Sequence, residues 1–176
     1  MVNDYADFEL IADSVGRLKQ FQELFESCSK LMTDALVNDG TIFCIGGQFC
    51  ASSAQQFIDL LASSPDETRP ALPALYIGAD MRGQKQFEAL AKENDFAVFF
   101  NDPARSANLE ALMDCCLEKG IASLLISPDL NHIEPTDKAL EIRLEYTCYS
   151  GYSTSLSAVS NYLTRSIEML LFGRQV

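Results

Sequence analysis

The residues best suited to chemistry lie in the stretch 44–57. Its small, hydroxyl and thiol side chains are Gly46, Gly47, Cys50, Ser52 and Ser53. They follow the β-branched and aromatic run 41–45, which predicts a buried strand, and they precede an amphipathic helix. A glycine turn at a helix N-terminus can hold an anion, because free amides and the helix dipole both favour negative charge. A plain structural turn needs the same residues, so both interpretations stay open.

The elements that must position this stretch alternate along the chain. Strands are expected near 41–45, 73–77, 96–100, 121–126 and 139–144. Helices are expected near 50–62, 82–94, 106–118 and 151–171. This alternation predicts an α/β fold, a three-layer αβα sandwich with a five-stranded parallel sheet. Ligands of such sheets lie beyond the carboxyl ends of the strands, so the loops 46–50 and 101–106 mark the expected pocket.

The segment 4–38 predicts one long N-terminal helix, bent near Gly16. Its apolar residues recur at three- and four-residue steps and so form a broad stripe. The segment is longer than a usual globular helix. We therefore expect residues 1–38 to pack between subunits as well as onto their own domain, which spans 1–176.

Composition narrows the class of protein. The 176 residues carry a formal net charge of −12 and a sequence pI of about 4.4. Direct nucleic-acid binding needs a basic face, so we do not expect it. No run approaches the roughly 20 apolar residues of a membrane span, and the acidic start of the chain is no secretory signal. A cytoplasmic protein without membrane contact is expected.

The six cysteines show no metal-binding spacing. None stands in a Cys-x-x-Cys pair, and the chain has one histidine. Several fall on apolar stretches of predicted helices, where a thiol behaves as a small hydrophobe. Reduced, mostly buried thiols are expected.

Four short motifs resemble a known family. They are 54–57 (Ala-Gln-Gln-Phe), 67–75 (Glu-Thr-Arg-Pro-Ala-Leu-Pro-Ala-Leu), 141–144 (Glu-Ile-Arg-Leu) and 171–172 (Leu-Phe). Together with the loop after 41–45, they resemble the sugar isomerase (SIS) domain family. The nearest branch holds the phosphoheptose isomerases and the initiator-associating protein DiaA. The resemblance implies a single SIS domain of flavodoxin-like fold.

The resemblance also implies a sugar-phosphate pocket made by two serine-rich loops. The first loop's phosphate-binding serine falls at Cys50, and its second glycine falls at Gln48. The second loop is 101–106, where Pro103 lacks an amide donor and Asp102 brings a like charge toward a phosphate. Arg105 could offset that charge. The vestigial pocket would comprise Gly46, Gly47, Cys50, Ser52, Ser53, Arg105 and Ser106. The simpler alternative makes 101–103 a turn and Ser106 a helix cap.

The zinc site of the family's isomerases is altered here. The matching positions are Gln56, Leu60, Ser153 and Asn161, none of which carries an imidazole or a carboxylate. Asp59 is one position away from a ligand position, and the sole histidine, His132, is expected in an exposed loop. The region 77–95 is also shorter than in the family. We therefore expect no metal, no cofactor and no catalytic residues.

The last helix ends in the pair Leu171 and Phe172, close to the polar terminus. An apolar pair there suits a protein-binding patch, although core packing is an equal alternative. By resemblance to DiaA, the leading hypothesis is a non-catalytic homo-oligomer, a tetramer, that binds the N-terminal domain of the replication initiator DnaA. It would promote DnaA assembly at the origin. The alternatives are a divergent phosphoheptose isomerase acting on sedoheptulose 7-phosphate through Asp59 or His132, and a phosphosugar-binding sensor.

Overall fold

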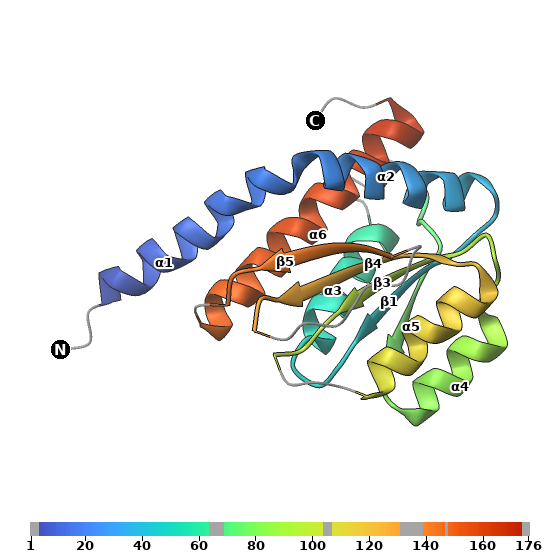
Figure 1. Cartoon of the computed structure of the whole chain (residues 1–176). Coiled ribbons are helices and arrows are strands. Elements are labelled where there is room, and N and C mark those ends of the chain that lie inside the picture. The colour runs from blue at the N-terminus through green and yellow to red at the C-terminus, as the bar shows by residue number, and fades with distance from the viewer. Residues whose placement is uncertain (1–3, 64–68, 104–106, 131–138, 147, 174–176) are drawn as a thin grey trace.

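The computed structural model describes residues 4–63, 69–103, 107–130, 139–146 and 148–173. Five parallel strands form one sheet in the order β2-β1-β3-β4-β5. The strands are β1 (Ile42–Gly46), β2 (Ala74–Gly78), β3 (Phe96–Phe100), β4 (Ala122–Pro128) and β5 (Ala139–Leu144). Helices cover both faces of the sheet, which confirms the predicted three-layer αβα fold (Figure 1).

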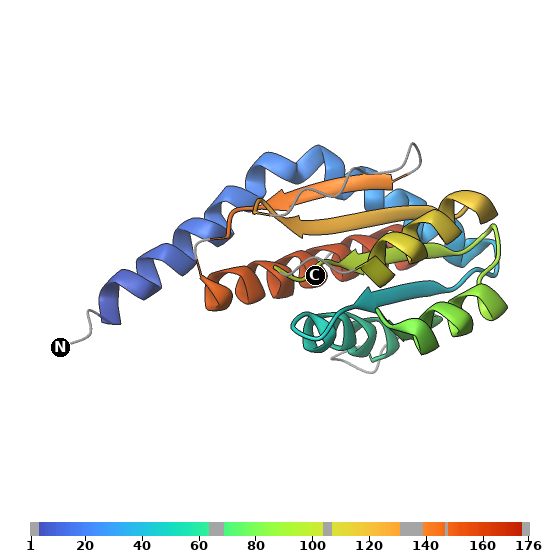
Figure 2. The ribbon, with the colours of Figure 1, turned by 60° about the horizontal axis from the view of Figure 1, so that its bottom comes forward.

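The helices divide between the two faces. They are α1 (Asp4–Gly16), α2 (Gln22–Val37), α3 (Ala51–Ala62), α4 (Met81–Leu90), α5 (Ala107–Lys119) and α6 (Tyr149–Phe172), with a 3₁₀ segment, η1 (Arg17–Phe21). Successive side chains of a strand point to opposite faces. In β1, Cys44 therefore packs in the core with α2, α3 and α6, whereas Phe43 and Ile45 pack with α4 and α5. Figure 2 shows the layers from a second direction.

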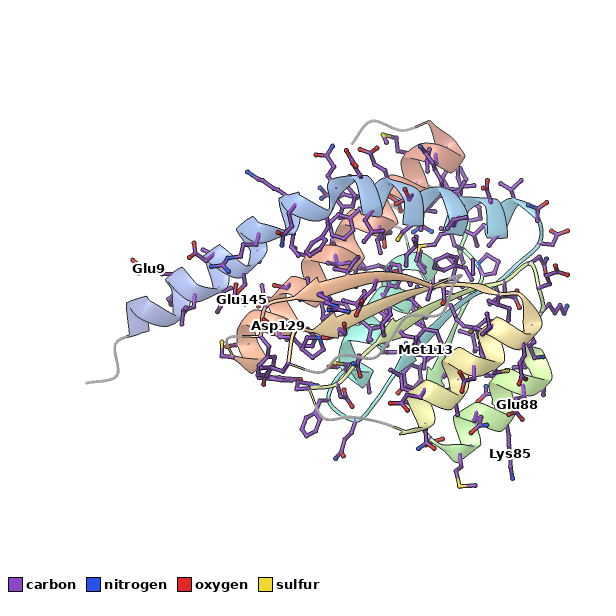
Figure 3. The ribbon with its side chains drawn as sticks, in the orientation of Figure 1. Glu9, Lys85, Glu88, Met113, Asp129 and Glu145 are labelled. Carbon is purple, nitrogen blue, oxygen red and sulfur yellow. The ribbon has the colours of Figure 1, made fainter. Side chains whose placement is uncertain are left out.

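The N-terminal segment is bent where the sequence predicts it. Helix α1 ends at Gly16, and η1 turns the chain into α2. Helices α1 and α2 both contact α6. The first turns of α1, including Glu9, extend past the sheet (Figures 1 and 3). This end of α1 is therefore placed to contact something other than its own sheet.

Helix α4 is shorter than predicted, because it ends at Leu90 rather than near residue 94. Ala91 already has an extended backbone. The buried carboxylate of Asp95 accepts hydrogen bonds from the amides of Lys92 (2.6 Å) and Thr41 (2.7 Å). These bonds give the amides of Lys92 and Thr41 an acceptor outside a helix. They also fix the turn 91–95 next to the start of β1.

All six cysteines lie in the described part of the chain and form no disulfide. Five are buried, as the sequence predicts, and Cys148 is partly exposed. Burial raises the pKa of the Cys28 thiol to about 12, so this thiol stays protonated at neutral pH. None of the helices in the described ranges is long and apolar enough to cross a membrane.

The motif around Arg69 has a structural role. The guanidinium of Arg69 donates to the carbonyls of Leu60 (2.7 Å) and Leu61 (2.8 Å), in the last turn of α3. It also pairs with Glu168 of α6. The Arg69 side chain is only 2% exposed. Carbonyls in the final turn of a helix have no partner within the helix. The Arg69 guanidinium supplies donors to two of these carbonyls in α3 and, through Glu168, connects α3 to α6.

Replacing Arg69 tests this tie. We expect Arg69→Met to lower the free energy of unfolding by about 2 to 4 kcal/mol, because the partly buried Glu168 carboxylate and two carbonyls lose their partner. Urea denaturation followed by circular dichroism measures the change. Arg82→Ala, at an exposed position of α4, is the matched control and should stay within about 0.5 kcal/mol of wild type. Equal stability of the two variants would contradict the assignment.

Candidate functional site

The candidate site lies at the carboxyl ends of the strands, between β1 and β3. Strand order reverses there, since β1 pairs with β2 on one side and with β3 on the other. Ligands of open α/β sheets bind at such a switch point. The described residues of the two loops, 46–50 after β1 and 101–103 after β3, therefore face each other.

A carboxylate of the chain itself occupies the first loop. Asp102 Oδ1 accepts a hydrogen bond from the backbone amide of Cys50 at 2.7 Å. Cys50 is the N-cap of α3, and its own side chain makes no cap hydrogen bond. Asp102 is 6% exposed, so its charge is almost wholly inside the protein. Negative charge is stabilised at a helix N-terminus by the free amides and the dipole.

Gly47 allows the carboxylate to come this close. A Cβ atom added at Gly47 would lie 2.0 Å from Asp102 Oδ2, which is far inside contact distance. A side chain at residue 47 would therefore displace the carboxylate of Asp102 from this position. The sequence leaves open whether the glycine pair lets the backbone approach an external anion or forms a plain structural turn.

Buried polar groups surround this contact. The Tyr152 hydroxyl donates to the carbonyl of Asn101 at 2.8 Å, and the Cys50 thiol contacts the same carbonyl at 3.4 Å. Burial, with Asp102 nearby, raises the pKa of both Cys50 and Tyr152. Both groups are therefore neutral near pH 7. The Asn101 side chain is fully buried, and its amide atoms have no partner among the described residues.

Two other strands end in loops that carry a carboxylate bound to a backbone amide. After β2, Asp80 accepts from the amide of Gly83 at 2.7 Å and caps α4. After β4, Asp129 accepts from the amide of Tyr146 at 2.9 Å. Burial, Asp80 and Asp102 together raise the pKa of the Tyr76 hydroxyl. The described part of this edge is therefore acidic.

The structure places only part of the predicted pocket together. Gly46 and Cys50 are buried, Ser53 is buried in α3, and Ser52 is exposed. Arg105 and Ser106 lie outside the described residues, as does His132. In the segment 101–103, which the sequence also allows as a simple turn, the Asp102 carboxylate reaches across to the loop after β1. Sequence reasoning noted the charge of Asp102 but missed its bond.

The positions that match the family's zinc ligands do not suit zinc. Gln56 accepts a hydrogen bond from the Ser157 hydroxyl at 2.8 Å, and the Asn161 amide donates to the carbonyl of Ser157 at 2.8 Å. Amide groups and the aliphatic Leu60 are not the imidazole, thiolate or carboxylate ligands that zinc prefers. Within the described ranges, no group of three or more His, Cys, Asp or Glu side chains could hold a metal ion.

An aromatic hollow lies beside the acidic edge. Its volume is about 670 Å³, and it is lined by Phe49, Pro103, Tyr146 and Tyr149. These residues follow β1, β3 and β5, so they share the carboxyl edge of the sheet. The Tyr149 hydroxyl donates to the carbonyl of Phe49 at 3.0 Å and joins two walls of the hollow. The sequence analysis missed this hollow, although an aromatic residue just beyond a strand was the available signal.

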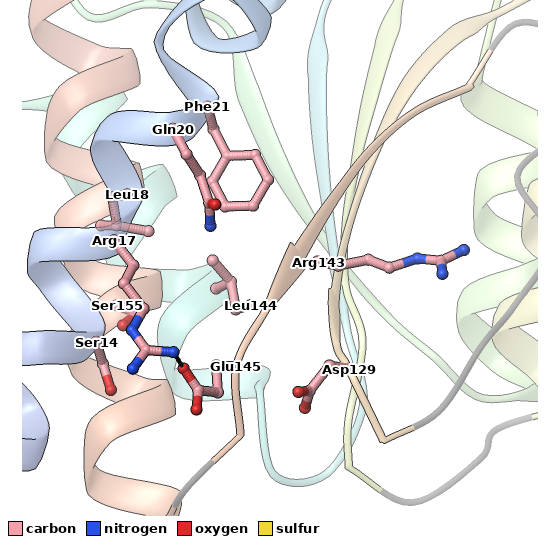
Figure 4. Close-up of a pocket in the computed structure, with 10 residues that line it drawn as sticks. All are labelled: Ser14, Arg17, Leu18, Gln20, Phe21, Asp129, Arg143, Leu144, Glu145 and Ser155. Atoms are coloured by element: carbon pink, nitrogen blue, oxygen red, sulfur yellow. Dashed lines mark hydrogen bonds and ion pairs between the residues drawn. The ribbon is translucent and has the colours of Figure 1, made fainter.

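A smaller cavity of about 280 Å³ lies between β5 and the N-terminal helices (Figure 4). Arg17 and Glu145 form an ion pair at its mouth. Arg143 points away from that pair and binds Glu141. Both arginines of this cavity are therefore paired with glutamates of the protein, and Asp129 binds the backbone amide of Tyr146.

Comparison with known proteins supports the fold. No protein-family model matches the chain. Among solved structures, a phosphoheptose isomerase from Francisella tularensis is 16% identical, with a TM-score of 0.78 over 96% of this chain and 100% of that one. The phosphoheptose isomerase GmhA from Neisseria gonorrhoeae is 18% identical, with a TM-score of 0.78 over 93% and 96%.

A third similar structure was solved with a bound ligand. The NanR protein of Vibrio vulnificus, complexed with ManNAc-6P, is 12% identical, with a TM-score of 0.71 over 97% of this chain and 64% of that one. At such identities the likeness establishes architecture and leaves the chemistry of the site open. The chain has the fold that phosphoheptose isomerases and other sugar-phosphate proteins share.

Proposed function

We propose that this protein is a non-catalytic scaffold of SIS fold that binds a protein partner through the end of α6. The observation that carries the proposal is the apolar surface of that end. Met169, Leu170 and Phe172 are 51%, 45% and 38% exposed. Three large apolar side chains within one turn are costly to leave in water, and such clusters mark interaction sites.

The two residues of the predicted partner-binding pair differ. Phe172 is exposed, whereas Leu171 is half-buried and packs against the core. Gly173, with φ of 65°, ends the helix directly after them. Phe172 and Leu170 are therefore the better contact residues, and Leu171 serves to hold the helix end in place.

The partner that we propose is the N-terminal domain of DnaA, and the resemblance to DiaA supports this choice. The protein would gather DnaA molecules and promote their assembly at the origin. Several copies of the patch on one oligomer would raise the effective concentration of bound DnaA. The net charge of −12 favours a basic, DNA-binding partner over DNA itself.

Surface plasmon resonance against the N-terminal domain of DnaA from the same organism tests the proposal. We expect saturable binding, with Kd raised at least about tenfold by Phe172→Ala or Leu170→Ala, because central apolar contacts dominate such interfaces. Leu117→Ala is the matched control, since Leu117 is 44% exposed and lies on α5, across the sheet. It should leave Kd unchanged. Absence of binding by the folded wild-type protein would rule out DnaA as the partner.

We also propose that the protein is a homo-oligomer, with α1 in the interface. Phe8 is 72% exposed and Leu10 is 42% exposed. Both lie on the helix that extends past the sheet in Figure 1. A second copy of the chain would cover these side chains, as the resemblance to a tetrameric family implies.

Light scattering after size-exclusion chromatography tests this arrangement. We expect a tetramer of 19.5 kDa chains, and Phe8→Glu should shift the mass toward smaller species, because a carboxylate cannot be buried there without a partner. Leu90→Glu, at a 47% exposed position of α4, is the control and should leave the mass unchanged. A monomeric wild-type protein would contradict the proposal.

The aromatic hollow favours a second candidate function, the binding of a sugar phosphate. The protein would then be either a phosphosugar sensor or an isomerase. Its place at the carboxyl edge of the sheet is where ligands of this fold class bind. Binding to the folded state would raise the melting temperature as the ligand concentration rises above Kd.

Thermal-shift measurements with sedoheptulose 7-phosphate separate the two candidates. We expect no concentration-dependent rise in melting temperature, because Asp102 already occupies the amide that would face a phosphate. A saturable rise would instead favour a phosphosugar sensor. If the purified protein also carried about one zinc per chain, an isomerase would become the better assignment.

A further inference from the structure

The buried carboxylate of Asp102 has a consequence that does not depend on the partner of α6. We propose that the Asp102 carboxylate occupies the anion-binding position at the start of α3. The protein's own side chain would thereby exclude small oxyanions such as phosphate esters. This inference rests on the geometry of the two loops alone. It holds whether or not the protein binds DnaA.

The first support is the contact itself. Asp102 Oδ1 accepts from the Cys50 amide at 2.7 Å, a short, charge-assisted distance. That amide begins α3, where a bound anion would also sit. A phosphate oxygen and the carboxylate oxygen would thus compete for the same donor, and both cannot bind it.

The second support is the way the surroundings fit the carboxylate. Asp102 Oδ2 fills the space in which a side chain at residue 47 would stand. The residue is 6% exposed, so the occupied position is closed to solvent. Asn101, directly before it, is fully buried with both amide atoms unpartnered in the described part of the chain. An unpartnered buried amide is costly, so this segment is polar as well as closed to solvent.

The third support is electrostatic. Asp80 and Asp129 add negative charge to the same edge of the sheet, and each is bound to a backbone amide. An incoming phosphate would meet this charge, as well as the displaced carboxylate of Asp102. Removing Asp102 leaves a hole of carboxylate size with the Cys50 amide pointing into it, and a small external anion should then fill it.

The experiment is chemical rescue of Asp102→Ala. We expect the variant to melt roughly 3 to 10 °C below wild type, because the helix start loses a charged hydrogen bond. Sodium formate or sodium phosphate should restore most of the loss, whereas sodium chloride at equal ionic strength should not. Wild-type protein, whose site is already filled, should gain less from formate and phosphate than the variant does, because only the general effect of these salts acts on it.

Two further variants serve as controls. Asp102→Asn fills the hole without the charge, so it should be destabilised but not rescued, and it covers the case in which the alanine variant fails to fold. Asp114→Ala removes one charge from an exposed position of α5 and should show neither loss nor rescue.

Three results would overturn the inference. They are an unchanged melting temperature for Asp102→Ala, equal effects of formate and chloride on that variant, and stabilisation of wild type by phosphate as strong as that of the variant. Rescue by either oxyanion supports it. The Asp102 variants leave the sequence of α6 unchanged. Failure of the chemical rescue would therefore contradict this inference without contradicting the proposed binding of DnaA, and the reverse also holds.

Discussion

The hydrogen bond from the Cys50 amide to the Asp102 carboxylate is the contact on which the character of the site depends. It joins the loops after β1 and β3, and it places an internal negative charge at the start of α3. Gly47, Tyr152 and Asn101 are arranged around it. A helix N-terminus offers unbonded amides that must be satisfied by water, a ligand or the chain, and here the chain supplies the acceptor.

Helix α6 connects this site to the rest of the molecule. Near its start, Tyr152 donates to the carbonyl of Asn101, and near its end Glu168 pairs with the buried guanidinium of Arg69. Between these points it packs on α1, α2 and α3. The helix is therefore fixed along its length, so the apolar side chains at its end are held in a defined position. A rigid patch loses less entropy on binding than a mobile one.

The fold alone does not choose between an enzyme, a sensor and a scaffold. Phosphoheptose isomerases and NanR, which was solved with ManNAc-6P, share this architecture with the chain at 18% identity or less. What differs is the residues at the carboxyl edge. In this chain the Gln56 side chain binds the Ser157 hydroxyl, and the Asp102 carboxylate binds the amide at the start of α3.

The sequence by itself determined the architecture, because apolar periodicity and glycine turns are local signals. It predicted each strand, the bend near Gly16 and the buried thiols to within a few residues. It also placed the loops of 46–50 and 101–106 at one edge. Only the tertiary structure decided what fills that edge, since Cys50 and Asp102 are 52 residues apart and meet because β1 pairs with β3. No local pattern records which side chain will satisfy a distant amide, and here the pairing of β1 with β3 brings the two residues within reach.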